Sequence, residues 1–180
     1  HKSGRVTRKV YIPHSQRPEP YDASHNPLNY RILRYADVLL MYAEVENALG
    51  DDGQARWALN KVRERVELDP VESDGTALRD AIRRERRLEL ALENQRLFDI
   101  RRWKNDSGKS VMSDIMGPNG SFVKYNTEES ADPYEVGNQK ESSSKGRNFK
   151  EERDLVFPIP TTEITQSNGS IVQNLSLIHI

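Results

Sequence analysis

The stretch from Leu78 to Trp103 limits the possible folds of this chain more than any other part of it. When the stretch is projected at about 100° per residue, its apolar residues fall on one face, as they do in an amphipathic helix that packs on a core. These residues are Leu78, Ala81, Ile82, Leu88 and Leu92. Glu85 and Glu89 fall inside the same face. We therefore expect helices over about 76–103 that anchor the fold and bury two carboxylates.

The two buried carboxylates need partners, because burying a charge alone is strongly unfavourable. Arginines are the expected partners, and suitable ones follow after a predicted bend at residues 93–95. They are Arg96, Arg101 and Arg102. A catalytic pair is the alternative interpretation of Glu85 and Glu89, but nothing near them in the sequence completes a mechanism. We favour an ion-paired anchor that pins one helical segment to another.

A helical hairpin is predicted before this stretch, over about 31–67. Apolar residues recur at steps of three and four, Gly50 stands where a helix ends, and Asp51 and Asp52 favour the start of a second helix that Pro70 bounds. The helix lengths are compatible with a tetratricopeptide-like unit. Because one hairpin cannot bury its apolar faces alone, we expect further helical neighbours.

The remaining chain is predicted to be irregular. Prolines interrupt the first 29 residues, which leave room for at most one short strand near Val10. The segment 104–174 is loop-rich, with short local structure and a brief extended run at 155–160. Trp57 projects away from the apolar face of its helix, and we favour its packing against a neighbouring helix over a role as a stacking platform for a planar or sugar ligand. The predicted fold class is mainly α.

The inventory of reactive residues predicts no catalytic residue, no metal site and no cofactor. There is no cysteine, and no two of the four histidines have the i, i+4 spacing of a helical metal site. Phosphate-binding, dinucleotide-binding and nucleophile-elbow motifs are also absent from the sequence. The formal net charge of −1 and the alternation of arginines with acidic residues between 80 and 104 argue against a nucleic-acid partner.

Three stretches resemble, in this order, the C-terminal part of the SusD/RagB family of outer-membrane nutrient-binding lipoproteins. They are RILRYADVLLMYAEVENALGD followed by ALNKVRERV, then LRDAIRRERRLELALENQRLFDIRRW, and finally LVFPIPTTEI. The sequence departs from the family pattern at Asp37, at Leu92 for an aromatic residue, at Asn94 for glycine and at Gln95 for histidine. The central motif is specific, because few families combine core-facing glutamates with a closing Arg-Arg-Trp.

The resemblance implies non-catalytic capture of extracellular nutrient, an oligosaccharide or a peptide, at the cell surface of the outer membrane. It further implies delivery to a SusC-like TonB-dependent transporter, and a lipid anchor on a preceding segment that this sequence does not include. No ligand-binding residue can be carried over to a position in this chain. The alternative is a generic helical-repeat module that binds other proteins.

The domain assignment follows from the same resemblance. Residues 1–174 are interpreted as the C-terminal part of a SusD/RagB-like domain. The apolar ending LSLIHI, residues 175–180, is interpreted as a non-native tail translated from a sequencing-library adaptor.

Overall fold

The computed structural model describes residues 7–20, 22, 27–117 and 149–173, together with the backbone of 123–125 and 139–141. This part of the chain is mainly helical, as the sequence predicts, with one short pair of strands. The chain divides into two compact units, Val6–Arg96 on the one hand and Leu97–Ile180 with His1–Arg5 on the other. Residues 175–180, for which a non-native origin is predicted, lie outside the described residues.

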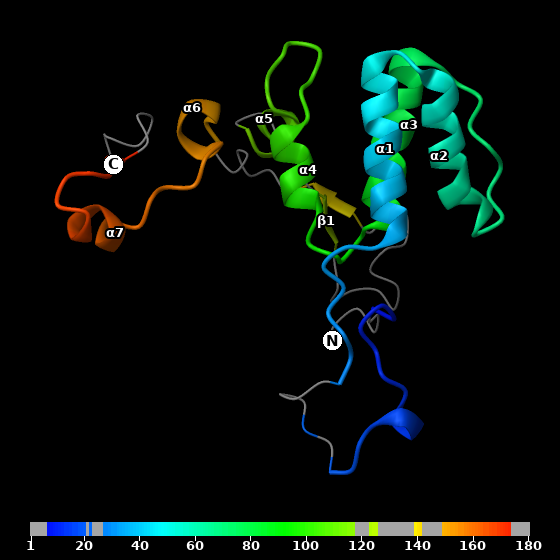
Figure 1. Ribbon diagram of the computed structural model, residues 1–180, viewed down its shortest axis with the longest axis horizontal. Coiled ribbons are helices and arrows are strands. Elements are labelled where there is room, and N and C mark those ends of the chain that lie inside the picture. The colour runs from blue at the N-terminus through cyan, green and yellow to red at the C-terminus, as the bar shows by residue number, and fades with distance from the viewer. Residues whose placement is uncertain are drawn as a thin grey trace. The chain divides into compact units, whose positions relative to one another are not determined.

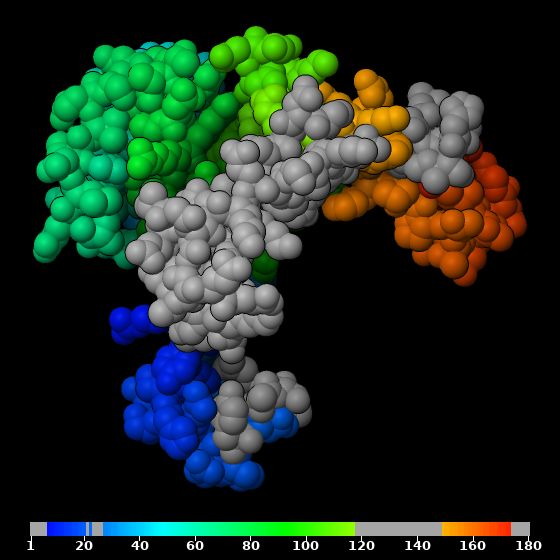
Figure 2. Space-filling model, turned by 180° about the vertical axis from the view of Figure 1, so that it is seen from behind, coloured from blue at the N-terminus to red at the C-terminus, as the bar shows by residue number. Residues whose placement is uncertain are grey.

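Three long helices form the first unit and run alongside one another in Figure 1. They are α1 (Tyr35–Leu49), α2 (Asp52–Glu64) and α3 (Gly75–Glu89), preceded by the short 3-10 helix η1 (His14–Gln16). The first two form an antiparallel hairpin, and α3 packs against both. In the space-filling view of Figure 2, α2 and α3 belong to one continuous packed body, in teal and green. The kinship of this hairpin to a tetratricopeptide unit stays a prediction.

The core of the first unit is built by all three helices. Leu40, Leu59 and Leu78 are fully buried at its centre, one from each helix. The other buried members are Leu39, Ala43, Ala55, Ala58, Val62 and Ile82. Fully burying a leucine contributes about 1.5–3 kcal/mol, so these contacts are the main source of stability of the unit.

Polar residues define where the helices begin and end. Gly50 ends α1 with a left-handed backbone (φ 88°), which glycine adopts without steric cost. Asp51 then accepts a hydrogen bond from the Gln54 backbone N–H at 3.0 Å and caps α2. The Asp52 carboxylate accepts hydrogen bonds from Asn47 Nδ2 and from the Gly75 N–H, both at 2.7 Å. Asp52 therefore links the end of α1, the start of α2 and the start of α3.

The helix boundaries differ from the sequence prediction in two places. The first helix begins at Tyr35 instead of near residue 31, because Arg34 is extended (φ −141°, ψ 160°). The third helix ends at Glu89, and a turn through Leu92, which has a positive φ, separates it from α4 (Arg96–Arg102).

The prediction that Leu88 and Leu92 lie on the buried face is wrong. Leu88 is 59% exposed and Leu92 is 73% exposed. The core face of α3 is centred between Leu78 and Ile82, which puts Leu88 at its margin, and Leu92 follows the end of the helix. Leu90 is buried instead.

The second unit has short elements joined by long connections. They are α4, α5 (Val111–Met116), β1 (Val123–Tyr125), β2 (Gln139–Glu141), α6 (Glu151–Asp154) and α7 (Thr161–Gln166). The strands are antiparallel, with Lys124 opposite Lys140. A small core contains Ile100, Met112 and Phe149. Among the described residues 7–20 and 155–160 there is no strand, and α7 is part of the short local structure predicted for 104–174.

Ser110 and Glu151 hold the centre of the second unit together. The buried Ser110 hydroxyl lies 2.9 Å from the Ile100 carbonyl oxygen and accepts a hydrogen bond from the Met112 N–H. The Glu151 carboxylate accepts hydrogen bonds from the Ser110 N–H at 3.0 Å and from the Ser113 hydroxyl at 3.3 Å. The Ser110 N–H lowers the pKa of Glu151 the most, against the opposing effect of burial. These contacts join the end of α4, the start of α5 and α6.

Candidate functional site

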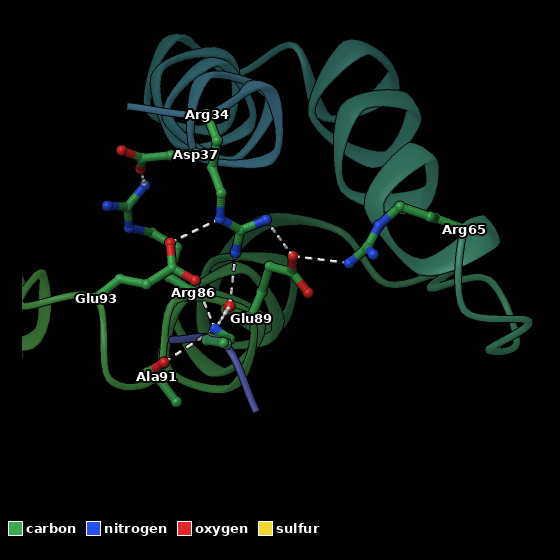
Figure 3. Close-up of polar contacts among 8 residues, drawn as sticks. Arg34, Asp37, Arg65, Arg86, Glu89, Ala91 and Glu93 are labelled. Carbon is green, nitrogen blue, oxygen red and sulfur yellow. Dashed lines mark hydrogen bonds and ion pairs between the residues drawn. The ribbon is translucent and has the colours of Figure 1, made fainter. Parts of the chain in front are cut away.

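Glu85 and Glu89 of α3 are paired with arginines, as the sequence predicts. Glu85 is buried, and its Oε2 atom lies 2.7 Å from Arg63 Nη1. Glu89 Oε1 lies 2.7 Å from Arg34 Nη1 and 2.7 Å from Arg65 Nη2 (Figure 3). The pairs therefore connect α3 to α2 and to the residue before α1.

The predicted identity of these partners is wrong. The sequence prediction takes them from the residues that follow, Arg96, Arg101 and Arg102, whereas the arginines on Glu85 and Glu89 precede them in the chain. Arg101 instead donates to the Asp154 carbonyl oxygen and stacks on the Phe157 ring, and Arg102 pairs with Asp99. The reason is the hairpin: α1 and α2 lie beside α3, whereas the turn at residues 90–95 ends the helix.

Arg34 donates three hydrogen bonds within this cluster. Its Nε atom donates to Glu93 Oε2 at 2.6 Å, Nη1 donates to Glu89 Oε1 at 2.7 Å, and Nη2 donates to the Glu89 carbonyl oxygen at 2.7 Å (Figure 3). This use of the planar fork is available to arginine and not to lysine. The hydrogen bond to Glu93 raises the pKa of Arg34 and outweighs the effect of burial.

Lys9 completes the cluster from the N-terminal side of the chain. Its ammonium group donates to the carbonyl oxygens of Glu89 at 2.6 Å and Ala91 at 2.9 Å, and to Glu93 Oε1 at 2.5 Å. Positive charge is favourable at the C-terminal end of a helix, where carbonyl groups lack partners. Burial opposes the ionisation of Glu93, but the hydrogen bonds from Arg34 and Lys9 prevail and lower its pKa.

A second, fully buried ion pair joins α1 to α3. Arg86 Nη1 lies 2.9 Å from Asp37 Oδ1, and both residues are buried. From the sequence, Asp37 stands out only as a departure from the family pattern, and Arg86 is one of the arginines that alternate with acidic residues between 80 and 104. The spacing of these residues could have predicted their burial. Asp37 stands three residues before Leu40 and Arg86 four residues after Ile82, so both lie on the core faces of their helices.

This cluster connects the three helices through ion pairs and engages the carboxylates of α3. A general acid or base needs a pKa near the working pH and access to a reacting atom. Here the hydrogen bonds to the Glu93 carboxylate favour its ionised form, and Glu85 and Glu89 are engaged by arginines. Within the described residues, no group of three or more His, Cys, Asp or Glu side chains is arranged to hold a metal ion.

The other candidate is the surface around Trp57, which is 48% exposed and meets Tyr42 edge to face at 6.3 Å between ring centroids. Trp57 and Lys61 line two adjoining open hollows of about 510 and 580 Å³. In the described residues Trp57 packs against Tyr42 of α1, but about half of its surface stays exposed. Lys61 is already paired with Glu64 at 2.8 Å, so the polar groups of the hollows are partly engaged.

These features define a helical scaffold held by internal ion pairs, and comparison with known proteins identifies its family. The model of the SusD family matches residues 1–176. The chain therefore belongs to the SusD family.

Relatives of the chain carry the same family name. The chain is 29% identical over 156 residues to SusD-like protein P2 of Formosa agariphila, which covers 81% of this chain and 25% of that protein. Over 82 residues it is 39% identical to a SusD-like protein of Bacteroides ovatus, covering 44% of this chain and 14% of that protein.

A crystal structure of a SusD-like protein from Bacteroides fragilis has a similar fold. It is 34% identical to this chain with a TM-score of 0.62, and the match covers 82% of this chain and 26% of that one. The chain thus spans about a quarter of the length of the proteins that it matches over most of its own length. Among the described residues, no helix has the length and apolar character needed to cross a membrane.

Proposed function

We propose that this chain is the C-terminal part of a surface-exposed outer-membrane protein that captures an extracellular nutrient, an oligosaccharide in the first place, without cleaving it. The captured ligand passes to a SusC-like TonB-dependent transporter, and a lipid on the preceding part of the protein anchors it to the membrane. The observation that carries this proposal is the match to the SusD family over residues 1–176.

The arrangement of charges supports a binding role for the whole protein and a scaffold role for this part. The carboxylates of α3 are engaged by Arg34, Arg63 and Arg65, which leaves them fixed in place instead of poised to transfer protons. Exposed aromatic residues, which stack on sugars in binding sites, are scattered over the described residues, and Trp57 is the main candidate because it lines two hollows. We expect most ligand contacts to come from the rest of the protein.

Calorimetry on the full-length protein and on the 180-residue chain tests this proposal. With a panel of oligosaccharides, the full-length protein should bind at least one, and chromatography of the mixture should show no shorter products. The 180-residue chain should bind weakly or not at all. Micromolar binding by the chain alone would instead place the ligand at Trp57 or in the segment 104–154.

A variant of the carboxylate cluster separates capture from catalysis. Glu89→Gln should lower the stability of the full-length protein and leave no activity to lose, because Glu89 holds Arg34 and Arg65. Glycan hydrolysis that disappears in Glu89→Gln but survives in Glu64→Gln, an exposed carboxylate paired with Lys61, would contradict the proposal.

The second candidate function is a helical-repeat module that binds other proteins. It is favoured by the exposed apolar residues on α1, such as Val38 and Val45. The gene upstream of this sequence discriminates the two. An upstream lipoprotein signal with its cysteine, together with an adjacent transporter gene, would favour nutrient capture. An upstream sequence that encodes a cytoplasmic repeat protein would favour the protein-binding module.

A further inference from the structure

The larger of the two hollows beside Trp57, of about 580 Å³, is lined by residues of both helices of the hairpin. The aromatic residues of its lining are Tyr35 and Trp57, and the charged ones are Arg34, Lys61 and Arg65. Within the part of the chain that the structure describes, no acidic side chain lines it. We call it the basic hollow.

One side of the basic hollow is a ridge of three long side chains. Trp57, Lys61 and Arg65 stand at i, i+4 and i+8, so they follow one another along a single face of α2. Arg65 comes after the last residue of α2, but its backbone is still helical (φ −57°, ψ −27°), so the ridge continues through it. The ridge therefore places an aromatic face, an ammonium group and a guanidinium group in a row.

Two of the cations keep hydrogen-bonding capacity for a ligand. Among the described residues Arg65 donates only to Glu89 (Figure 3), and its side chain is 57% exposed, with further N–H donors on its guanidinium group. Lys61 pairs with Glu64, but both side chains are exposed, and such surface pairs contribute little to stability. An incoming anion can therefore replace Glu64 at Lys61.

The neighbouring hollow has the opposite charge. Trp57 and Lys61 also line this smaller hollow, but its other charged residues in the described chain are the carboxylates of Glu64 and Glu67. An anionic group beside Trp57 is therefore attracted to the basic hollow and repelled from the smaller one.

We propose that the basic hollow binds an acidic sugar residue, one that carries a carboxylate or a sulfate group, of the captured oligosaccharide. The proposal rests on the proposed function and narrows the nutrient to an anionic oligosaccharide. The sugar ring lies on the exposed face of Trp57, and its anionic group accepts hydrogen bonds from Lys61 and Arg65. Acidic side chains of a peptide would satisfy the cations but carry no ring for the aromatic face.

Calorimetry on the full-length protein with matched pairs of glycans tests the proposal. One pair is an oligogalacturonate and its methyl ester, and the other is a sulfated galactan oligosaccharide and its desulfated form. In at least one pair the acidic form should bind about tenfold more tightly than the neutral form, because charge-assisted hydrogen bonds are the stronger ones. The pair that shows this preference distinguishes carboxylate from sulfate.

Two outcomes of this measurement would overturn the proposal. One is an equal affinity for the acidic and neutral forms of both pairs. The other is an oligoglutamate peptide that binds more tightly than either acidic glycan.

Variants of Lys61 assign the preference to the basic hollow. Lys61→Met removes the charge and should lower the affinity for the preferred acidic glycan about tenfold, whereas Lys61→Arg should retain it. Glu64→Gln, which releases Lys61 from its ion pair, should bind at least as tightly as wild type. Lys109→Met makes the same change at an exposed lysine of the second unit and should have no effect. Wild-type affinity in Lys61→Met would contradict the proposal.

The failure of this proposal is distinguishable from the failure of the proposed function. If the full-length protein binds a neutral oligosaccharide and no acidic one, nutrient capture stands and the acidic-sugar site is wrong. If it binds no oligosaccharide of either kind, oligosaccharide capture is wrong, and the acidic-sugar site with it.

Discussion

The internal contacts that stabilise the two units of this chain are of different kinds. Val6–Arg96 has a core of nine buried apolar residues shared by three long helices, and ion pairs connect the helices at their margins. Among the described residues of Leu97–Ile180, the buried apolar cluster contains three residues, and single polar side chains join the short elements. We infer that loss of one buried side chain, charged or apolar, is the main threat to the first unit, whereas loss of one hydrogen bond is the main threat to the second.

The largest effect is expected at the buried ion pair of the first unit. Arg86→Met leaves Asp37 buried without its arginine and should lower the free energy of unfolding by about 3–5 kcal/mol. Urea unfolding of the full-length protein measures the change. The double variant Asp37→Leu with Arg86→Met should recover much of the loss, and a double variant as unstable as Arg86→Met would show that the charge is not its cause.

A core deletion in the first unit comes next. Leu59 is fully buried beside Leu40, so Leu59→Ala should cost about 2–5 kcal/mol in urea melts. Leu88→Ala is the matched control, since the same atoms are removed from an exposed position. A loss below about 0.5 kcal/mol for Leu59→Ala would contradict the packing of the hairpin.

The second unit should respond to a single hydroxyl. Ser110→Ala removes the buried group that caps α5 and meets the Ile100 carbonyl oxygen, and should cost about 1–2 kcal/mol. Ser113→Ala removes only the longer hydrogen bond to Glu151 and serves as the control. Hydrogen exchange of the α5 amides measures both, and equal effects would show that Ser110 has no special role.

The smallest effect is a pH dependence in the first unit. Because the pKa of Glu93 is lowered in the folded protein, its contribution to stability is present above its usual value of 4.5 and is lost as the pH falls through the lowered folded value. Glu93→Gln should therefore be less stable than wild type at pH 7, and the difference should shrink below pH 4.5. Lys9→Met removes one of the hydrogen bonds that lower the pKa of Glu93. It should therefore also be less stable than wild type at pH 7, with a difference that shrinks below pH 4.5. Parallel curves for wild type and Glu93→Gln would contradict the link.

The order of the helices could be predicted from the sequence because their signals are local. Apolar periodicity, Gly50 and Asp51 place the hairpin within a few residues. The need of Glu85 and Glu89 for arginine was also predictable, since it follows from their place on an apolar face. The identity of the arginines was not, because any helix that the fold brings near can supply them.

The residues that the prediction missed lack a local sequence pattern that would connect them to the cluster. Arg34 and Lys9 lie outside the long helices, in segments without periodicity, so no pattern connects them to α3. Asp37 and Arg86 are charged residues on core faces, which a periodicity analysis assigns to the surface. Ligand contacts do not follow from local patterns either, because they depend on surfaces that distant segments form together.

The contacts of Lys9 have a consequence for biosynthesis. Lys9 and Glu93 are 84 residues apart in the chain, and Arg34 is 59 residues from the same carboxylate. At about 5–20 residues per second, the ribosome needs on the order of ten seconds between the first of these residues and the last. Until Glu93 emerges, α1 and α2 lack both the helix that completes their core and the carboxylates that their arginines bind. The nascent hairpin, complete only after Glu64, therefore exposes its apolar core face until these residues follow.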